Sequence, residues 1–249
     1  GGWTMGVYKT TNSGNTWVAF MLAIMISERM EHKKVTMANV HKFVPNLHMK
    51  GLKIKDFDHL PSPRVFRNEN PSWDPYYPKT IYLVRDPRAV YLSYYHHWLH
   101  TDQANHGSLE EFVEELLKHG CIKRWESWLT RWDVQVNDWI CREKRQPVKI
   151  VRYEDLVENR EKWFREIVDF SGFEPSSELF ALAVEQGGFE NMQKNEKTHG
   201  AEAFSGEKGE KGLFVRKGQV DSWKEEMPNH IIEKIEKEFK ETMIRFGYL

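Results

Sequence analysis

A short polar loop between two apolar runs is the first part of the chain that could bind an anion. The loop reads Thr10-Thr11-Asn12-Ser13-Gly14-Asn15-Thr16-Trp17. Small hydroxyl and amide side chains around one Gly let successive backbone N–H groups converge, and a helix that starts there adds about half a positive charge. The pattern predicts a phosphate cradle, with an ordinary capped helix start as the alternative. It is not the usual nucleoside-triphosphate loop, which needs Lys where this chain has Asn15.

A second place carries groups that suit the same kind of anion. Arg85 ends the strand-like run Lys79–Arg85, and Ser93 follows eight positions later in a predicted helix. A guanidinium offers paired donors that match phosphate oxygens, and a hydroxyl on the second turn of the next helix reaches the same group. Arg88, at the start of that helix, is expected to be a solvated charge instead.

A third pair of cations lies near the C-terminus, where Arg216 and Lys217 precede Gly218. Two adjacent cations followed by Gly fit a loop that folds over a phosphate, since Gly permits close approach of the backbone. The cations are concentrated rather than abundant, because 36 Lys and Arg nearly cancel 37 Asp and Glu and leave a net charge of -1. This balance argues against a nucleic-acid or membrane-surface binder, which needs a broad cationic field.

The elements that must position these residues alternate along the chain. Strand-like runs rich in Val, Ile, Tyr or Phe are Met5–Thr10, Arg64–Asn68, Lys79–Arg85 and Val148–Tyr153. Helical periodicity predicts helices over Asn15–Arg29, Arg88–His100, Leu109–His119, Ile122–Arg142, Asp155–Ser171, Ser177–Gln186 and His230–Phe246. The alternation predicts an α/β fold, a three-layer sandwich with a mostly parallel central sheet, in which ligands bind beyond the carboxyl ends of the strands.

The chain has 249 residues and no internal repeat, which favours a single domain over residues 3–249, with Gly1 and Gly2 set aside as a cloning remnant. Gly187–Gly218 is rich in Gly, Lys, Glu and Asn and is expected to form a long mobile loop, either a lid over the site or a plain insertion. Cys121 and Cys141 are expected to be reduced structural thiols.

Four segments together resemble the cytosolic-type sulfotransferase family. Ser13–Trp17 is similar to the family's opening loop, Y-P-K-S-G-[NT]-T-W, and Lys79–Arg88 to its second signature, a strand that ends in Arg. Tyr153–Leu156 matches the family's Y-E-D-L, and Arg216–Gly218 with Trp223 matches its late R-K-G-x-x-x-x-W. The matches come in the family's order over residues 8–224, and the final helix and G-Y ending extend the resemblance to nearly the whole chain.

The resemblance implies an enzyme that moves a sulfuryl group from 3′-phosphoadenosine 5′-phosphosulfate (PAPS) to a hydroxyl, or less readily an amine, of a small molecule, with no metal. In the family the opening loop holds the 5′-phosphosulfate, the strand-end Arg and the Ser hold the 3′-phosphate, and the Y-E-D-L Tyr lies near the adenine. The residues implied to bind PAPS are Ser13, Gly14, Asn15, Thr16, Trp17, Arg85, Ser93, Tyr153, Arg216, Lys217 and Gly218. Trp17 would offer the base a flat stacking surface.

The sequence departs from the family beside the leaving group. In the family a Lys directly precedes S-G-N-T-W and contacts the phosphosulfate near its bridging oxygen, whereas this chain has Asn12 there and Lys9 three residues earlier. Either the loop brings Lys9 round, or Arg216, Lys217 or Asn12 stabilises the leaving group, and Lys9 as a plain strand-end charge is equally compatible. An amide in place of a cation could weaken transition-state stabilisation by roughly a few kcal/mol.

The second departure concerns the general base. The family's K-T-H-x-P segment supplies a His, and alignment on Pro71 places Glu69 at that position. More distant glycosaminoglycan sulfotransferases are understood to use a Glu, but this carboxylate would need burial, for instance against Trp73, to raise its pKa toward neutrality. The alternatives are His59, which precedes the predicted strand Arg64–Asn68, another His, or no base at all.

Aromatic residues near the second signature suggest an apolar acceptor pocket. These are Tyr76, Tyr77, Tyr94, Tyr95 and Trp98. His96 and His100 fall on one helical face beside His97, but the sequence offers no further ligand to complete a zinc set, so they are expected to line the pocket or lie in solvent.

Two other functions fit parts of this pattern. A nucleotide-dependent kinase would require Mg²⁺ and prefer ATP, and the missing Gly-Lys-[ST] counts against it. A binding module that kept the nucleotide site but lost turnover is compatible with Asn12 and Glu69. The chain shows no membrane-spanning run and is expected to be cytoplasmic, with its oligomeric state left open.

Overall fold

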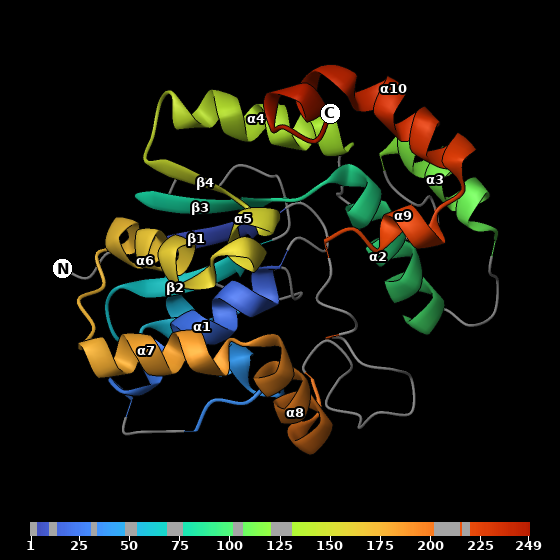
Figure 1. The fold of residues 1–249 in the computed structure, drawn as a ribbon. Coiled ribbons are helices and arrows are strands. Elements are labelled where there is room, and N and C mark those ends of the chain that lie inside the picture. Colours follow the sequence, from blue (N-terminus) through green and yellow to red (C-terminus); the bar gives the residue numbers. More distant parts are fainter. Residues whose placement is uncertain are drawn as a thin grey trace.

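The computed structural model describes most of the chain, namely residues 4–9, 14–30, 34–47, 54–68, 77–101, 107–120, 131–201, 215 and 220–249. Strands lie in the middle of the molecule with helices on both sides (Figure 1). Across these ranges, no helix combines the length and the apolar character that crossing a membrane requires.

Parallel strands form the central sheet. They are β1 (Thr4–Lys9), β2 (Arg64–Asn68), β3 (Lys79–Val84) and β4 (Val148–Arg152). The strand order is β2-β1-β3-β4, and each neighbouring pair is parallel. The predicted strands and the three-layer α/β class are confirmed, because parallel neighbours need crossover connections and these place helices on both faces.

Helices cover both faces of this sheet. They are α1 (Asn15–Ser27), α2 (Pro87–Thr101), α3 (Leu109–His119), α4 (Trp132–Glu143), α5 (Tyr153–Glu158), α6 (Arg160–Ser171), α7 (Ser177–Gln186), α8 (Phe189–His199), α9 (Trp223–Glu226) and α10 (Asn229–Arg245), with short 3₁₀ turns η1 (Val40–Lys42) and η2 (Ile54–Phe57). Figure 1 shows α1 and α7 on one side of the sheet and α4 and α10 on the other.

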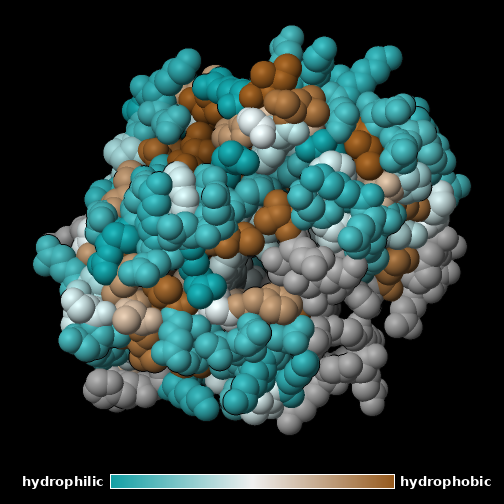
Figure 2. Space-filling view, in the orientation of Figure 1, coloured by the Kyte–Doolittle hydropathy of each residue, from teal (hydrophilic) through white to brown (hydrophobic). Residues whose placement is uncertain are grey.

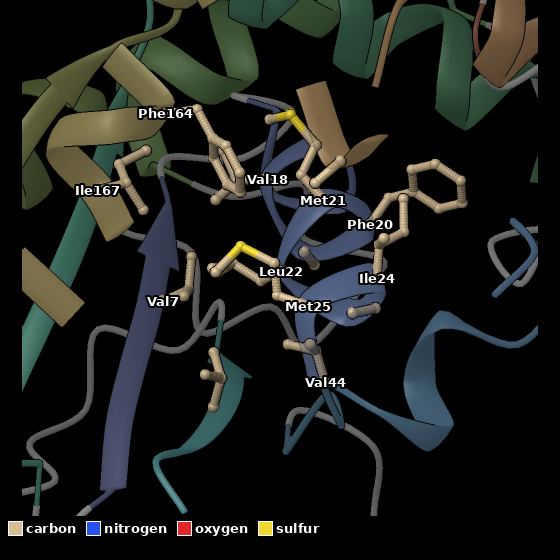
Figure 3. Close-up of a cluster of buried hydrophobic side chains, with 14 of the residues drawn as sticks. Val7, Val18, Phe20, Met21, Leu22, Ile24, Met25, Val44, Phe164 and Ile167 are labelled. Carbon is tan, nitrogen blue, oxygen red and sulfur yellow. The ribbon is translucent and has the colours of Figure 1, made fainter. Parts of the chain in front are cut away.

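The strands send alternate side chains into two separate cores. On β3, Ile81 and Leu83 join the core that α1, α6 and α7 cover, whereas Tyr82 and Val84 join the core that α2, α3, α4 and α10 cover. This period of two is what a sheet buried on both faces requires. Helix α1 is apolar on nearly every side, and Figure 3 shows its side chains clustered with Val7 of β1 and with Phe164 and Ile167 of α6.

Two predicted helices are wrong at one point each. The predicted helix Asp155–Ser171 is broken at Asn159, whose side chain accepts a hydrogen bond from the N–H of Lys162 at 3.0 Å and so caps α6. The predicted helix Ile122–Arg142 cannot be continuous, because Arg131 has an extended backbone and α4 starts at Trp132. The guanidinium of Arg131 instead pairs with Asp133 in the first turn, 3.0 Å away. Residues 121–130 lie outside the described ranges.

The prediction of one long loop over Gly187–Gly218 is also wrong in its first part. Residues Phe189–His199 form α8, which buries Met192 and Glu196. The buried positions lie four residues apart, too few to produce a clear apolar period in the sequence, and the rest of the helix is polar. Residues 202–214 and 216–219 lie outside the described ranges.

The strand ends that could form a site meet at one edge of the sheet. Because β1, β3 and β4 are parallel neighbours, the turns into α1, α2 and α5 leave from the same edge. Figure 2 shows the surface hollowed near the middle, where the start of α1 and the corner between α7 and α8 lie in Figure 1. The predicted binding residues Gly14, Trp17, Arg85 and Tyr153 lie at this edge.

Candidate functional site

Helix α1 begins at a glycine that no other residue could replace without strain. Gly14 has φ 88° and ψ 15°, the left-handed region. A Cβ at Gly14 would lie 2.7 Å from Cδ2 and 3.1 Å from Cε2 of Tyr153. The Tyr153 ring therefore packs directly on the backbone at the start of α1, with no room for a side chain between them.

The start of α1 is polar, buried and uncapped. The first N–H groups of a helix have no intrahelical partner, and α1 has neither a side-chain cap hydrogen bond nor an acidic residue in its first turn to satisfy them. Asn15 is only 2% exposed, and its Oδ1 has no hydrogen-bond partner among the described residues. Backbone amides and the positive end of the helix dipole at one spot suit an anion.

Two aromatic rings continue the site away from the start of α1. The Trp17 and Tyr153 rings meet edge to face, with centroids 5.6 Å apart and an interplanar angle of 67°. The indole Nε1 of Trp17 donates a hydrogen bond to the carbonyl of Gly187 at 2.7 Å. The first turn of α1, the start of α5 and the corner between α7 and α8 are thereby held together.

Arg85 lies on the same tyrosine. Its guanidinium carbon is 4.2 Å from the centroid of the Tyr153 ring, a cation–π contact. The backbone carbonyl of Arg85 accepts a hydrogen bond from the indole of Trp132 at 3.0 Å, which fixes the residue at the end of β3. Ser93, half-buried, follows on the second turn of α2. One ring thus contacts both an open helix N-terminus and a guanidinium.

A buried carboxylate joins the two turns that carry Arg85 and Tyr153. Glu154 accepts a hydrogen bond from the backbone N–H of Asp86 at 3.0 Å and another from the hydroxyl of Tyr248, also at 3.0 Å. Burial raises the pKa of the Glu154 carboxyl, and these hydrogen bonds and the charge of Arg85 only partly offset it. Burial, and then the charge of Glu154, also raise the pKa of the Tyr248 hydroxyl.

Arg88 is not the solvated charge that its place at a helix start predicts. It is 6% exposed, its Nη2 donates to Asp86 Oδ2 at 2.6 Å and to the Tyr248 carbonyl at 2.8 Å, and it also pairs with Glu236. Its guanidinium lies 3.9 Å from the ring centroid of Trp223. Three acceptors and an aromatic face surround the guanidinium in place of water. Through these contacts Arg88 connects the turn after β3 to the C-terminal helix.

A sequence model described as the sulfotransferase domain matches residues 5–247, almost the full chain. The chain belongs to the sulfotransferase family. Mouse Sulfotransferase 1E1 is 26% identical over 244 residues, which cover 93% of this chain and 80% of the mouse protein. The resemblance stated from the motifs is confirmed, and with it sulfuryl transfer as the reaction.

Solved structures show that the fold of this sulfotransferase is shared. Retinol dehydratase in a complex with retinol and PAP superposes with a TM-score of 0.72 at 18% identity, covering 96% of this chain and 81% of that one. A mouse sulfotransferase complexed with PAP gives a TM-score of 0.69 at 18% identity, covering 97% of this chain and 84% of the other. At this identity the likeness concerns the architecture.

The fold brings part of the predicted site together. Gly14, Trp17, Arg85 and Tyr153 form one connected group, and Asn15, Thr16 and Ser93 lie on the helices that start beside it. Lys9 ends β1, and its side chain is outside what the structure describes, as are Asn12, Ser13, Glu69, Arg216, Lys217 and Gly218. The roles of these seven residues stay predictions.

The alternative base His59 lies away from the site. It is exposed and precedes β2, and Ser62, three residues later, accepts a hydrogen bond from Arg29 at 2.9 Å. Arg29 follows the C-terminal end of α1, whereas the site lies at the N-terminal end, a helix length of about 20 Å away. The structure therefore separates His59 from the strand ends.

Helix α8 holds the chain next to the predicted late cations. Glu196, 5% exposed, accepts a hydrogen bond from the N–H of Val215 at 2.9 Å, and Gln193 donates to the Val215 carbonyl at 3.2 Å. Asn195 accepts a hydrogen bond from the backbone of Met37 at 2.9 Å. Glu196 was not predicted, because an acidic residue in a polar helix carries no signal that would have marked it. Val215 directly precedes Arg216.

The aromatic and histidine cluster near α2 is mostly occupied by packing. Tyr77 and Tyr94 are 5% and 4% exposed and belong to the core on the α2 side of the sheet, with Tyr94 edge-on to Phe112. His96 Nε2 lies 2.9 Å from Glu226 Oε2, which links α2 to α9. In the part of the chain that the structure covers, no group of three or more His, Cys, Asp or Glu could hold a metal ion.

Glu154 and Asp86 could have been singled out from the sequence. Each directly follows a residue chosen for its place at the end of a buried strand, and a charged residue there must find a partner. Tyr248 could not have been singled out in this way, because it lies 94 residues from its partner Glu154 along the chain.

Proposed function

We propose that this sulfotransferase takes its sulfuryl group from PAPS and transfers it to a hydroxyl, or to an amine, of a small-molecule acceptor. The observation that carries the proposal is the Tyr153 ring, which packs against Gly14 on one side and lies 4.2 Å from the Arg85 guanidinium. Two sites suited to anions thereby flank one aromatic surface. A nucleotide with phosphates at both its 3′ and 5′ positions matches that arrangement.

The residues present suit this donor. The open first turn of α1, including Asn15 and Thr16, offers backbone amides for the 5′-phosphosulfate, and Arg85 with Ser93 offers paired donors for the 3′-phosphate. The edge-to-face pair of Trp17 and Tyr153 gives the adenine an aromatic wall. Bound PAPS supplies an activated sulfuryl group on a phosphate leaving group.

Catalysis would then consist mainly of orientation and charge stabilisation by groups of this chain. We assign proton removal from the acceptor to Glu69 and stabilisation of the leaving group to Lys9 or Asn12 together with Arg216 and Lys217. The contacts of α8 with Val215 support the role of the late cations, because they anchor the residue just before Arg216.

The acceptor is proposed to carry an apolar or aromatic part. The structurally similar retinol dehydratase was solved with retinol, and a rabbit relative 26% identical to this chain is named amine sulfotransferase. Tyr95, half-buried on α2, is the described member of the predicted aromatic set that lies outside the two cores. It packs against the second core through Phe112.

Transfer of radiolabelled sulfate from PAPS to a panel of phenols, alcohols and amines tests the proposal. Two thermal-shift measurements run in parallel, one with PAP (3′-phosphoadenosine 5′-phosphate), the nucleotide left after sulfuryl transfer, and one with Mg²⁺ and ATP. We expect PAP to stabilise the protein and Mg²⁺ with ATP not to do so. We also expect labelled product with at least one acceptor. Stabilisation by PAP without transfer to any acceptor would favour a binding module, and stabilisation only by Mg²⁺ and ATP would favour a kinase.

A further inference from the structure

A half-buried arginine that has no partner among the described residues lies beside the aromatic wall. Arg160 begins α6, and its Nη2 lies 3.6 Å from the point where a Cβ on Gly188 would be. Gly188 follows Gly187, whose carbonyl holds the Trp17 indole. Arg160 therefore borders the corner between α7 and α8 at the edge of the proposed adenine surface.

Nothing within the described ranges satisfies this guanidinium. Arg160 forms no hydrogen bond, ion pair or ring contact there, and its Nε is fully buried without a partner. Burial alone lowers the pKa of Arg160, with no carboxylate to oppose it. By contrast, Arg152 lies 3.9 Å from Asp155, and Arg165 covers the Phe180 ring at 3.3 Å. An unpaired, partly desolvated arginine is costly unless a ligand completes it.

Asn191 supplies an acceptor next to this donor. Its Nδ2 donates to the carbonyl of Glu185 at 2.8 Å, and its Oδ1 forms no hydrogen bond with the described residues and is available as an acceptor. The same Nδ2 lies 3.8 Å from the position that a Cβ on Gly188 would take, the point that Arg160 also approaches. A guanidinium donor thus lies near a side-chain amide whose oxygen is available as an acceptor. Adenine has the complementary pair on its edge, a ring nitrogen that accepts beside an amino group that donates.

We propose that Arg160 and Asn191 read the edge of the donor's adenine, Arg160 by donating to a ring nitrogen and Asn191 by accepting from the exocyclic amino group. The inference rests on the proposed use of PAPS and adds to it the residues that select the base. Hypoxanthine reverses the pattern at the six-membered ring, with a carbonyl acceptor and an N–H donor, and has the same size. Inosine 3′,5′-bisphosphate is therefore the matched probe, with both phosphates unchanged.

Calorimetric titrations with PAP and with inosine 3′,5′-bisphosphate test this assignment. We expect the wild-type protein to prefer PAP by about tenfold, the usual discrimination of one well-placed pair of base contacts. Arg160→Met should weaken PAP binding about five- to tenfold and nearly abolish the preference, and Asn191→Ala should reduce it as well. Arg165→Met is the control, because it removes the same charge from the same helix at an exposed position.

The outcomes separate this inference from the proposed function. If the wild-type protein fails to bind PAP, both are overturned. If it binds PAP but Arg160→Met keeps the wild-type preference, only the base-reading role is overturned. Equal weakening of both nucleotides by Arg160→Met would show a general charge effect and would also overturn the role. Folding of each variant is checked by its unfolding temperature without ligand.

Discussion

Replacing Gly14 by Ala should damage nucleotide binding more than stability. An alanine at φ 88° adopts the left-handed region, which costs about 1–2 kcal/mol, partly offset by the lower entropy of the unfolded chain. Its Cβ would also lie 2.7 Å from the Tyr153 ring, so the ring must shift. We expect the free energy of unfolding to fall by about 2 kcal/mol in total.

The shift of the Tyr153 ring carries the functional consequence. The Arg85 guanidinium rests on that ring, a contact worth about 0.5–2 kcal/mol, and would lose its position with it. We therefore expect PAP to bind at least about tenfold more weakly to Gly14→Ala.

Urea unfolding and calorimetric titration measure the two effects separately. Gly172→Ala is the matched control, because Gly172 has φ 70° at the C-terminal end of α6, away from the strand ends. It should lose about 1 kcal/mol of stability and keep its affinity for PAP. Wild-type affinity in Gly14→Ala, together with the same stability loss as the control, would refute the phosphate cradle at this glycine.

Three further changes address the other parts of the site. Arg85→Ala should weaken PAP binding at least about tenfold because a paired donor to phosphate is lost, while the control Arg64→Ala, at the far end of β2, should not weaken it. Equal affinities of the two variants for PAP in calorimetry would contradict the assignment of Arg85. Glu69→Gln should keep PAP affinity and lower turnover by about 10² or more, and an unchanged rate of labelled-sulfate transfer would remove Glu69 from the mechanism. Burial raises the folded-state pKa of Glu154, so the free energy of unfolding should fall as pH rises from about 4.5 through that folded-state pKa. Urea unfolding at several pH values should show a flatter slope for Glu154→Gln than for the wild-type protein. Identical slopes would refute the contribution of Glu154.

The sequence was sufficient for the sheet and for the residues at strand ends. The β-branched and aromatic runs predicted each strand to within one residue at either end, because a strand buried on both faces has a strong local composition. Gly14 and Arg85 followed from the same logic, since a parallel sheet fixes where its carboxyl ends lie.

Contacts between distant segments could not be predicted in this way. Arg88 looked like a solvated charge because its partners Glu236 and Tyr248 come about 150 residues later in the chain. The helix over Phe189–His199 was missed because its buried face consists of only Met192 and Glu196, and one of these is charged. Local composition carries no record of which distant group neutralises a buried charge.

We propose that two anion sites on either side of Tyr153 bind both ends of one nucleotide. Calorimetric comparison of PAP with adenosine 5′-phosphate tests it most directly, because only the 3′-phosphate differs between them. We predict that PAP binds about a hundredfold more tightly, as expected for charge-assisted hydrogen bonds to one phosphate, and that Arg85→Ala brings the two affinities close together. Equal affinities of the wild-type protein for the two nucleotides, or no saturable binding of PAP, would contradict it.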